Sequence, residues 1–245
     1  MRLEQKQSCH SAAIIFIGTG KYIDYFPKYY ATSKKLFLPK TPKVYIVLTD
    51  KTDSPLLEGK ADVTPVNIKA SQWPFPTLLR YHYIANASEQ FKKHSHLIFM
   101  DADMYAFSLI TEEEFFLHDR PLFGVQHPGF IGKKGSFESN PASTACVSKT
   151  DDLGTYWQGC FWGGLTNEVL TLCKELARRI DDDLSRNVIA IWHDESHLNK
   201  YFIERKNMVH TYHPGYSFPE TLWDKLAYEK KIVHLLKDHK ERRSI

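Results

Sequence analysis

The sequence predicts an α/β protein whose mixed, mostly parallel sheet is flanked by helices. Three observations lead to this class: short apolar runs recur along the chain, helix-like segments separate them, and carboxylates follow two of the runs. Strands that alternate with helices favour a parallel sheet, because a crossover helix returns the chain to the edge where the strand began. We expect one domain over residues 1–245, since this length is ordinary for a single α/β domain.

The first half of the chain supplies three strands and two helices. The expected strands cover 12–18, 43–49 and 63–68, and the expected helices cover 26–37 and a segment from Trp73-Pro-Phe-Pro76 to about residue 93. The first strand ends in a Gly18-Thr-Gly20 turn. A dinucleotide fingerprint requires a third glycine where Ile23 stands, so we do not expect Rossmann-type NAD binding.

The second half continues the alternation and contains one long loop. Expected strands cover 97–100, 122–126 and 156–164, and expected helices cover 111–116, 166–182 and a segment opening at residue 193. Thr166 is the expected cap of its helix. Residues 127–153 are rich in Gly, Ser, Asn and Lys, and loops this long in compact domains are usually functional. A basic tail occupies about 228–245.

Composition and charge limit the classes of function. A hydrophobic content of 42% and a charged content of 25% are those of a globular protein with a core. The net charge of +3 is too small to indicate nucleic acid as a partner. Four scattered cysteines indicate free thiols in a reducing compartment. No apolar run is long enough for a signal sequence or a membrane span, so we expect an unanchored, complete, cytoplasmic protein.

The first candidate site is Asp101-Ala-Asp103, directly after the apolar run 97–100. In an extended chain, residues two apart point to the same face, and ligands collect beyond the carboxyl ends of strands in open α/β sheets. Two carboxylates at such a place suit Mg²⁺ or Mn²⁺ on a substrate's phosphates. The alternative is a solvated strand end that binds nothing.

The second candidate site opens the helix at residue 193. His193 and His197 have the spacing of zinc proteases, but Asp194 stands where that motif requires glutamate, so we do not expect a zinc hydrolase. We expect Asp194 to cap the helix and the helix N-terminus to keep Glu195 ionised. Such a carboxylate can act as a nucleophile, a base or a stabiliser of an oxocarbenium-like centre. Its structural alternative is a favourable first-turn acid.

Four blocks in order resemble the signatures of glycosyltransferase family 6, which includes the blood-group A and B transferases. They are His127-Pro-Gly-Phe130, Tyr156-Trp-Gln-Gly-Cys-Phe-Trp-Gly-Gly164, Trp192-His-Asp-Glu-Ser-His-Leu-Asn-Lys-Tyr201 and Leu222-Trp-Asp224. The resemblance implies a GT-A fold and a retaining transfer of galactose or N-acetylgalactosamine. The donor would be a UDP-sugar, and the acceptor the 3-OH of a galactoside or oligosaccharide, giving an α-1,3 bond.

The resemblance also implies roles for individual residues. Glu195 matches the catalytic glutamate, and the pair Asp101 and Asp103 matches the ligands of Mn²⁺ (or Mg²⁺). Residues matching the donor and nucleotide site are Phe16, Ile17, Tyr22, Arg80, Asp101, Asp103, Asp224 and Lys237. Residues matching acceptor binding or sugar choice are His127, Gln158, Cys160 and Trp192.

Three departures from the family pattern bear on activity. Many bacterial relatives replace both aspartates with asparagine and work without metal, whereas this chain keeps Asp101 and Asp103, so we expect metal dependence. The acceptor-loop motif is shortened to Phe137-Glu138. Cys160 replaces a glycine or alanine and should crowd an N-acetyl group, which favours UDP-galactose. The rival functions are a phosphohydrolase with Asp101 as nucleophile, and a sugar-binding module without turnover.

Overall fold

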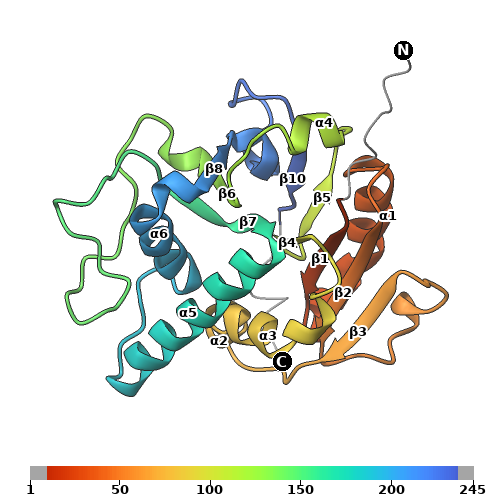
Figure 1. Ribbon diagram of the computed structural model, residues 1–245, viewed down its shortest axis with the longest axis horizontal. Helices are drawn as coiled ribbons and strands as arrows, with labels where there is room; N and C mark the ends of the chain where they lie inside the picture. The colour runs from red at the N-terminus through yellow and green to blue at the C-terminus, as the bar shows by residue number, and fades with distance from the viewer. Residues whose placement is uncertain (1–9, 237–245) are drawn as a thin grey trace, which may run out of the picture.

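A computed structural model describes residues 10–236, which form a central sheet with helices on both faces (Figure 1). Within that range the sheet has seven strands in the order β3-β2-β1-β4-β7-β6-β8. Their bounds are β1 Ala12–Ile17, β2 Lys43–Thr49, β3 Val63–Asn67, β4 His96–Met100, β6 Leu122–Gln126, β7 Trp157–Leu165 and β8 Val209–Tyr212. Only β7 runs antiparallel to its neighbours, β4 and β6, so the predicted mixed, mostly parallel sheet is confirmed.

Alternating side chains of the central strands enter two separate cores. In β1, Ala13 and Ile15 pack into one core, whereas Ile14 and Phe16 pack into the other. All four are fully buried, as is almost every residue of β4. A strand covered on both faces needs apolar residues at every position, which explains the continuous apolar runs in the sequence.

The helices cover the two faces of the sheet. Helices α3, α5 and α6 contribute to one core, and α1 and α4 contribute to the other; α3 and α5 lie side by side (Figure 1). Their bounds are α1 Phe26–Leu36, α2 Phe75–Leu78, α3 Arg80–Asn86, α4 Glu112–Phe115, α5 Thr166–Ser185 and α6 Asp194–Glu204. Short 3₁₀ helices are η1 Gly20–Tyr25, η2 Pro55–Leu57, η3 Ser88–Gln90, η4 Pro128–Phe130, η5 Lys206–Met208, η6 Pro214–Ser217 and η7 Glu220–Leu222.

A small second sheet joins the last described strand to the segment that follows Asp103. Its order is β5-β10-β9, with bounds β5 Met104–Ala106, β10 Ile232–His234 and β9 Phe218–Pro219. Strand β10 pairs antiparallel with β5, which starts directly after Asp103. This pairing brings β10 to the end of β4, although the two strands are more than a hundred residues apart in the sequence.

Two predicted helix features are wrong. The helix expected from Trp73 to about residue 93 is broken into α2 and α3 at Leu79, and α3 ends at Asn86. Asn86 and Ser88 are weak helix formers, because their side chains compete for backbone hydrogen bonds. Thr166 does not cap α5; Leu165 is the N-cap, and the Thr166 hydroxyl donates to the His94 carbonyl at 2.7 Å.

Two expectations from composition can be compared with the described residues. Cys146, Cys160 and Cys173 are free thiols, as predicted, while Cys9 lies outside the described range. Among residues 10–236, we find no helix with both the length and the apolar character needed to cross a membrane.

We expect acid to destabilise the fold through His96, the first residue of β4. Burial, with smaller contributions from His10 and His118, lowers the pKa of His96 to about 4. The unfolded chain would hold its proton up to about pH 6.5, so it binds more protons between those values. The free energy of unfolding should therefore fall as pH falls through this window, by up to about 1.4 kcal/mol per pH unit.

Urea unfolding at several pH values checks this expectation. His96→Gln should lose less stability than the native chain between about pH 6.5 and about pH 4.5, because glutamine takes up no proton. An identical pH dependence in the two proteins would show that His96 is not the group responsible.

Candidate active site

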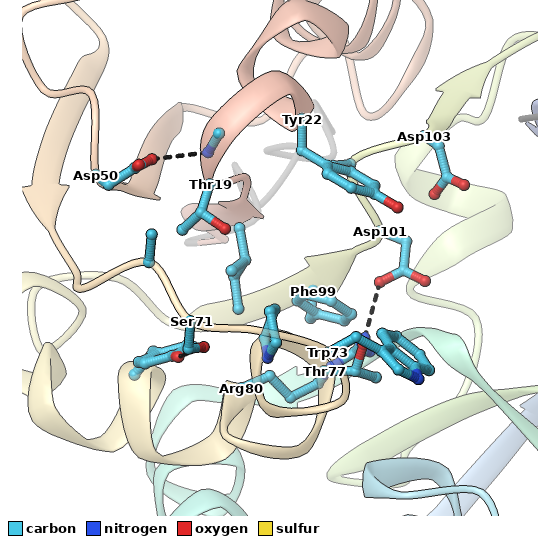
Figure 2. A pocket seen from close by; sticks show the side chains of 16 residues that line it. Thr19, Tyr22, Asp50, Ser71, Trp73, Thr77, Arg80, Phe99, Asp101 and Asp103 are labelled. Atoms are coloured by element: carbon cyan, nitrogen blue, oxygen red, sulfur yellow. Dashed lines mark hydrogen bonds and ion pairs between the residues drawn. The ribbon is translucent and has the colours of Figure 1, made fainter. Parts of the chain in front are cut away.

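The carboxyl ends of β1, β2 and β4 line a cavity of about 270 Å³ (Figure 2). The turn after β1 is fixed there, because the Gly20 amide donates to Asp50 Oδ1 at 2.9 Å. Of the residues predicted for the donor and nucleotide site, Ile17, Tyr22, Arg80, Asp101 and Asp103 line this cavity. Phe16 does not; its ring is fully buried behind the cavity and packs edge-on against Phe26.

A second cavity, of about 280 Å³, adjoins the first. It lies between the end of β4, the start of β7 and the start of α6, and the predicted residues that line it are Arg80, Asp101, Gln158, Cys160, Trp192 and Glu195. Trp73, Thr77, Arg80 and Asp101 line both cavities. The two cavities therefore meet at Asp101, one toward the predicted nucleotide residues and the other toward Glu195.

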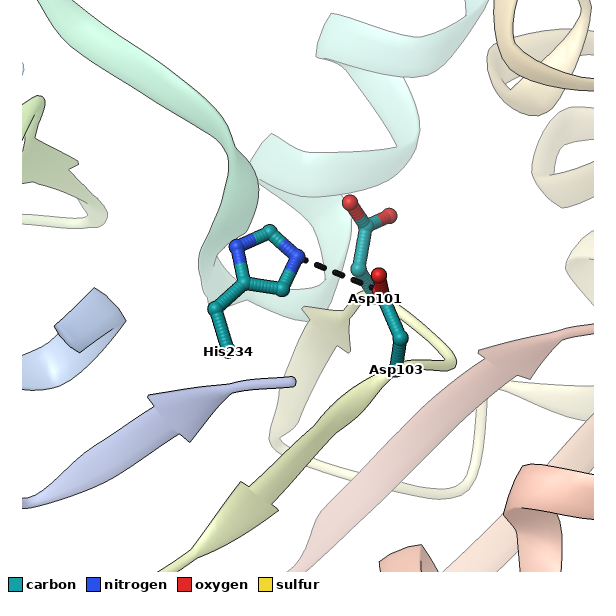
Figure 3. Close-up of side chains that lie close together, drawn as sticks. All are labelled: Asp101, Asp103 and His234. Atoms are coloured by element: carbon teal, nitrogen blue, oxygen red, sulfur yellow. Dashed lines mark hydrogen bonds and ion pairs between the residues drawn. The ribbon is translucent and has the colours of Figure 1, made fainter. Parts of the chain in front are cut away.

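Asp101 and Asp103 lie together with His234 (Figure 3). One ligand atom from each of the three residues can be chosen so that all lie within 4.8 Å of one another. The aspartates are joined by a turn, since the Met104 amide donates to the Asp101 carbonyl at 3.1 Å. The extended geometry predicted for this pair is therefore wrong, but the two carboxylates still meet.

Arg80, the first residue of α3, connects the two candidate sites. Its guanidinium lies 3.2 Å from Asp101 Oδ1 and 3.0 Å from Asp194 Oδ2, and it donates to the Gly159 carbonyl at 2.7 Å. The side chain is buried and stacks on Phe99, with 4.6 Å from its central carbon to the ring centroid. The two carboxylates keep this arginine charged in spite of its burial, and its contacts fix it in place.

The start of α6 differs from the prediction. Asp194 is not the N-cap; it is the first helical residue, and His193 holds the cap position with a positive φ of 52°. Such a backbone conformation is unusual for a residue other than glycine. Asp194 is instead buried against Arg80, and burial raises the pKa of Asp194 to about 7 in spite of the nearby guanidinium.

Glu195 points into the second cavity and is held by two donors. The Tyr156 hydroxyl donates to Oε1 at 2.7 Å, and the Gly159 amide donates to Oε2 at 2.8 Å. Burial raises the pKa of Glu195, whereas these two hydrogen bonds lower it. The helix N-terminus was predicted to keep Glu195 ionised. Burial outweighs that effect and raises the pKa, and the two hydrogen bonds offset part of the rise.

The surroundings of strand β7 explain why its sequence mixes large and small residues. A Cβ atom at Gly159 would lie 3.2 Å from the Cβ of Glu195, so glycine allows β7 and α6 to approach closely. Trp157 and Trp162 are buried in the core. The first part of β7 lines the second cavity through Gln158, Gly159 and Cys160, and the two tryptophans pack in the core.

Ser217 orients two of the predicted sugar-selecting residues. Its buried hydroxyl donates to Gln158 Oε1 at 2.6 Å and also interacts with the Cys160 thiol. This hydrogen bond fixes which way the amide of Gln158 points, and the donor that the side chain can offer to a ligand is its amide nitrogen. Burial raises the pKa of Cys160, so the thiol stays protonated.

The predicted acceptor residues lie around the long loop. Trp192 is 47% exposed, and its indole N–H donates to Ser136 of the loop at 2.8 Å. The ring of His127 packs on Tyr156, and its Nδ1 accepts from the Gly129 amide. Burial lowers the pKa of His127 to about 4, with His234 as the next cause. His127 lines neither cavity.

One predicted donor residue, Asp224, is not brought to the cavities. Asp224 is exposed and lines neither of them. Lys237 lies outside the described residues, as does the rest of the predicted basic tail from residue 238 onward.

Sequence reasoning missed several residues of the site. Asp50 could have been found, since it follows the end of β2 as Asp101 follows β4. Tyr156 could be seen within its block, but its bond to Glu195 could not. Ser217 and His234 carry no local signal, because only strand pairing and loop packing bring them to the site.

Comparisons with known proteins identify relatives of this chain. The chain is 31% identical over 234 residues to the O-antigen biosynthesis glycosyltransferase WbnI of Escherichia coli, covering 94% of this chain and 95% of that protein. It is 29% identical over 230 residues to histo-blood group ABO system transferase 1 of Rattus norvegicus, covering 89% of this chain and 64% of that protein.

A third relative is the globoside alpha-1,3-N-acetylgalactosaminyltransferase 1 of Homo sapiens, 23% identical over 224 residues, with 86% of this chain and 60% of that protein covered. This chain thus spans less than two thirds of either animal protein. The family model of glycosyltransferase family 6 matches residues 5–244. A match over nearly the whole chain means that this protein belongs to glycosyltransferase family 6, and its sheet is the GT-A type of that family.

Proposed function

We propose that this enzyme transfers galactose from UDP-galactose to the 3-OH of a galactoside acceptor, with retention and with help from a divalent cation. N-acetylgalactosamine is the second donor to consider. The observation that carries the proposal is the meeting of two cavities at Asp101, which lies between the predicted nucleotide residues and Glu195. A sugar attached to a diphosphate needs this order of sites: nucleotide, phosphates, then reacting carbon.

The residues at the junction fit a divalent cation on the donor phosphates. Asp101, Asp103 and His234 offer two carboxylates and one imidazole, a donor set suited to Mn²⁺. When bound, the cation would neutralise the charge that develops on the departing UDP. Arg80 holds Asp101 in position and adds a second fixed positive charge beside the phosphates.

Glu195 supplies the negative charge that the electron-poor anomeric carbon requires. It lines the second cavity, which we call the sugar-side cavity. Its two hydrogen bonds hold the carboxylate in one orientation. A carboxylate in this place can form a covalent bond to the sugar or stabilise attack from the same face, and either route retains the configuration. Trp192 and His127 then provide the acceptor side, because both lie at the edge formed by the long loop.

The donor preference is assigned from Cys160. Its buried thiol lines the sugar-side cavity beside Gln158 and takes space that glycine would leave open. In a competition between equal UDP-galactose and UDP-N-acetylgalactosamine, we expect galactose to be transferred several-fold faster. Cys160→Gly should move the ratio toward N-acetylgalactosamine by about tenfold, since fit within a pocket is worth about 1–3 kcal/mol. A native preference for N-acetylgalactosamine would contradict the assignment.

The relatives support the remaining parts of the proposal. One is named for O-antigen biosynthesis and another for an alpha-1,3 transfer, which favour an oligosaccharide acceptor and an α-1,3 bond. We also propose that residues 1–245 act as one catalytic domain and that the enzyme works in the cytoplasm, as the bacterial relative suggests.

One assay separates this function from its rivals. The protein is incubated with UDP-galactose, Mn²⁺ and lactose or a fucosylated galactoside, and UDP release and the product linkage are measured. An α-1,3-linked product supports the proposal. Phosphate release from small phosphoesters without sugar transfer would indicate a phosphohydrolase using Asp101, and UDP-sugar binding without turnover would indicate a sugar-binding module.

A further inference from the structure

His234 is held beside the aspartate pair by the main chain. Strand β10 pairs with β5 so that His234 lies opposite Met104, and the next amide, Leu235 N, donates to the Asp103 carbonyl at 2.9 Å. The imidazole therefore reaches the turn from a different strand, in a register that backbone hydrogen bonds determine. A surface side chain that meets an aspartate by chance would lack this support.

The spacing of the three side chains fits one ion. His234 Nε2 lies 3.1 Å from Asp103 Oδ1, and the chosen ligand atoms of all three residues lie within 4.8 Å of one another. Ligands at about 2.1–2.2 Å from a common cation are about 3 Å apart when adjacent and about 4.4 Å apart when opposite. The cluster can thus close around a cation with small side-chain movements.

The cluster opens toward the substrate side. The Asp103 side chain is 2% exposed, whereas His234 is 18% and Asp101 is 24% exposed. Asp101 and His234 both line the sugar-side cavity, so a diphosphate can approach the same point. Three protein ligands on one side and an open side toward the substrate are the arrangement of catalytic metal centres.

We propose that His234 is a third protein ligand of the divalent cation, joining Asp101 and Asp103, and that its nitrogen makes the centre prefer Mn²⁺ over Mg²⁺. The inference rests on the proposed metal-dependent function and adds a ligand to it. Imidazole suits transition metals better than Mg²⁺, which prefers oxygen ligands and retains its waters. Removing the nitrogen should therefore weaken Mn²⁺ binding more than Mg²⁺ binding.

Pulsed electron paramagnetic resonance of Mn²⁺ on the full chain tests the ligand directly, first with Mn²⁺ alone and then with Mn²⁺ and UDP. The native protein should show modulation from a directly coordinated ¹⁴N nucleus, and His234→Ala should lose it. His210→Gln is the matched control: it removes a histidine of β8 that stacks on His118, and it should keep the signal. If His234 only orients Asp103, the native protein should show no nitrogen modulation.

Metal titrations of the same proteins give the second readout. His234→Ala should weaken Mn²⁺ binding about tenfold or more, and Mg²⁺ binding by less than about threefold. If Asp103→Asn abolishes Mn²⁺ binding but His234→Ala leaves both affinity and spectrum unchanged, the assignment of His234 as a third ligand is wrong. The proposed metal-dependent function is still supported in that case. If native protein does not bind Mn²⁺ even with UDP, the proposed metal site fails, and the inference with it.

Discussion

Glu195→Gln should lower the rate of sugar transfer by about a thousandfold or more while leaving UDP affinity within about twofold. The change removes the negative charge and keeps the shape. Glutamine can still accept the Gly159 amide with its oxygen and can donate to the Tyr156 hydroxyl with its nitrogen, so the local structure should persist. UDP affinity should persist because Glu195 lines only the sugar-side cavity. Initial rates and calorimetric titration with UDP measure the two effects.

Glu204→Gln is the matched control, since it is the same substitution at the other end of α6. Glu204 pairs with Arg179 and Lys200 and lies outside both cavities, so this variant should transfer sugar at close to the native rate. A Glu195→Gln enzyme with near-native turnover would remove Glu195 from the reaction. A parallel loss in both variants would instead point to damage of the helix.

Removal of divalent cations should lower transfer by about a hundredfold or more, and added Mn²⁺ should restore it, because a cation contributes several kcal/mol of charge stabilisation. Asp103→Asn should cause a loss of similar size that Mn²⁺ does not restore. Asp103 is the cleaner position to change, since Asp101 is also paired with Arg80. The measurement is UDP release after dialysis against a chelator, with and without added Mn²⁺.

Asp62→Asn provides the control for losing an aspartate elsewhere. Asp62 pairs with Lys34 and Tyr30 at the far end of the sheet, and its loss should leave transfer and metal response unchanged. Full activity in the chelated native enzyme would show that this chain neutralises the donor phosphates without metal.

Much of the fold could be predicted because the buried strands carry their own signal. The apolar runs 43–49 and 122–126 correspond to β2 and β6 as observed. Both faces of this sheet are covered, so nearly every strand position is apolar and the ends of the runs mark the ends of the strands. The helix broken at Leu79 was not predictable in this way, since packing against the sheet, not local propensity, decides where such a segment bends.

The site was predictable where a local motif carries it. The position of Asp101-Ala-Asp103 after an apolar run indicates a candidate site. The block around Glu195 is long enough to indicate the family of the protein. The environment of these residues was not predictable. Asp194 was expected at a helix cap, yet it is buried against Arg80, because a partner more than a hundred residues away satisfies its charge.

By itself, the sequence determined the class of fold, the glycosyltransferase family and the three carboxylates that the proposed reaction needs, Asp101, Asp103 and Glu195. Only the tertiary structure decided which groups surround them. His234 reaches Asp103 through the pairing of β10 with β5, and Ser217 orients Gln158 from the 3₁₀ helix η6. Contacts between distant segments depend on strand pairing and packing, which leave no mark in the local pattern of residues.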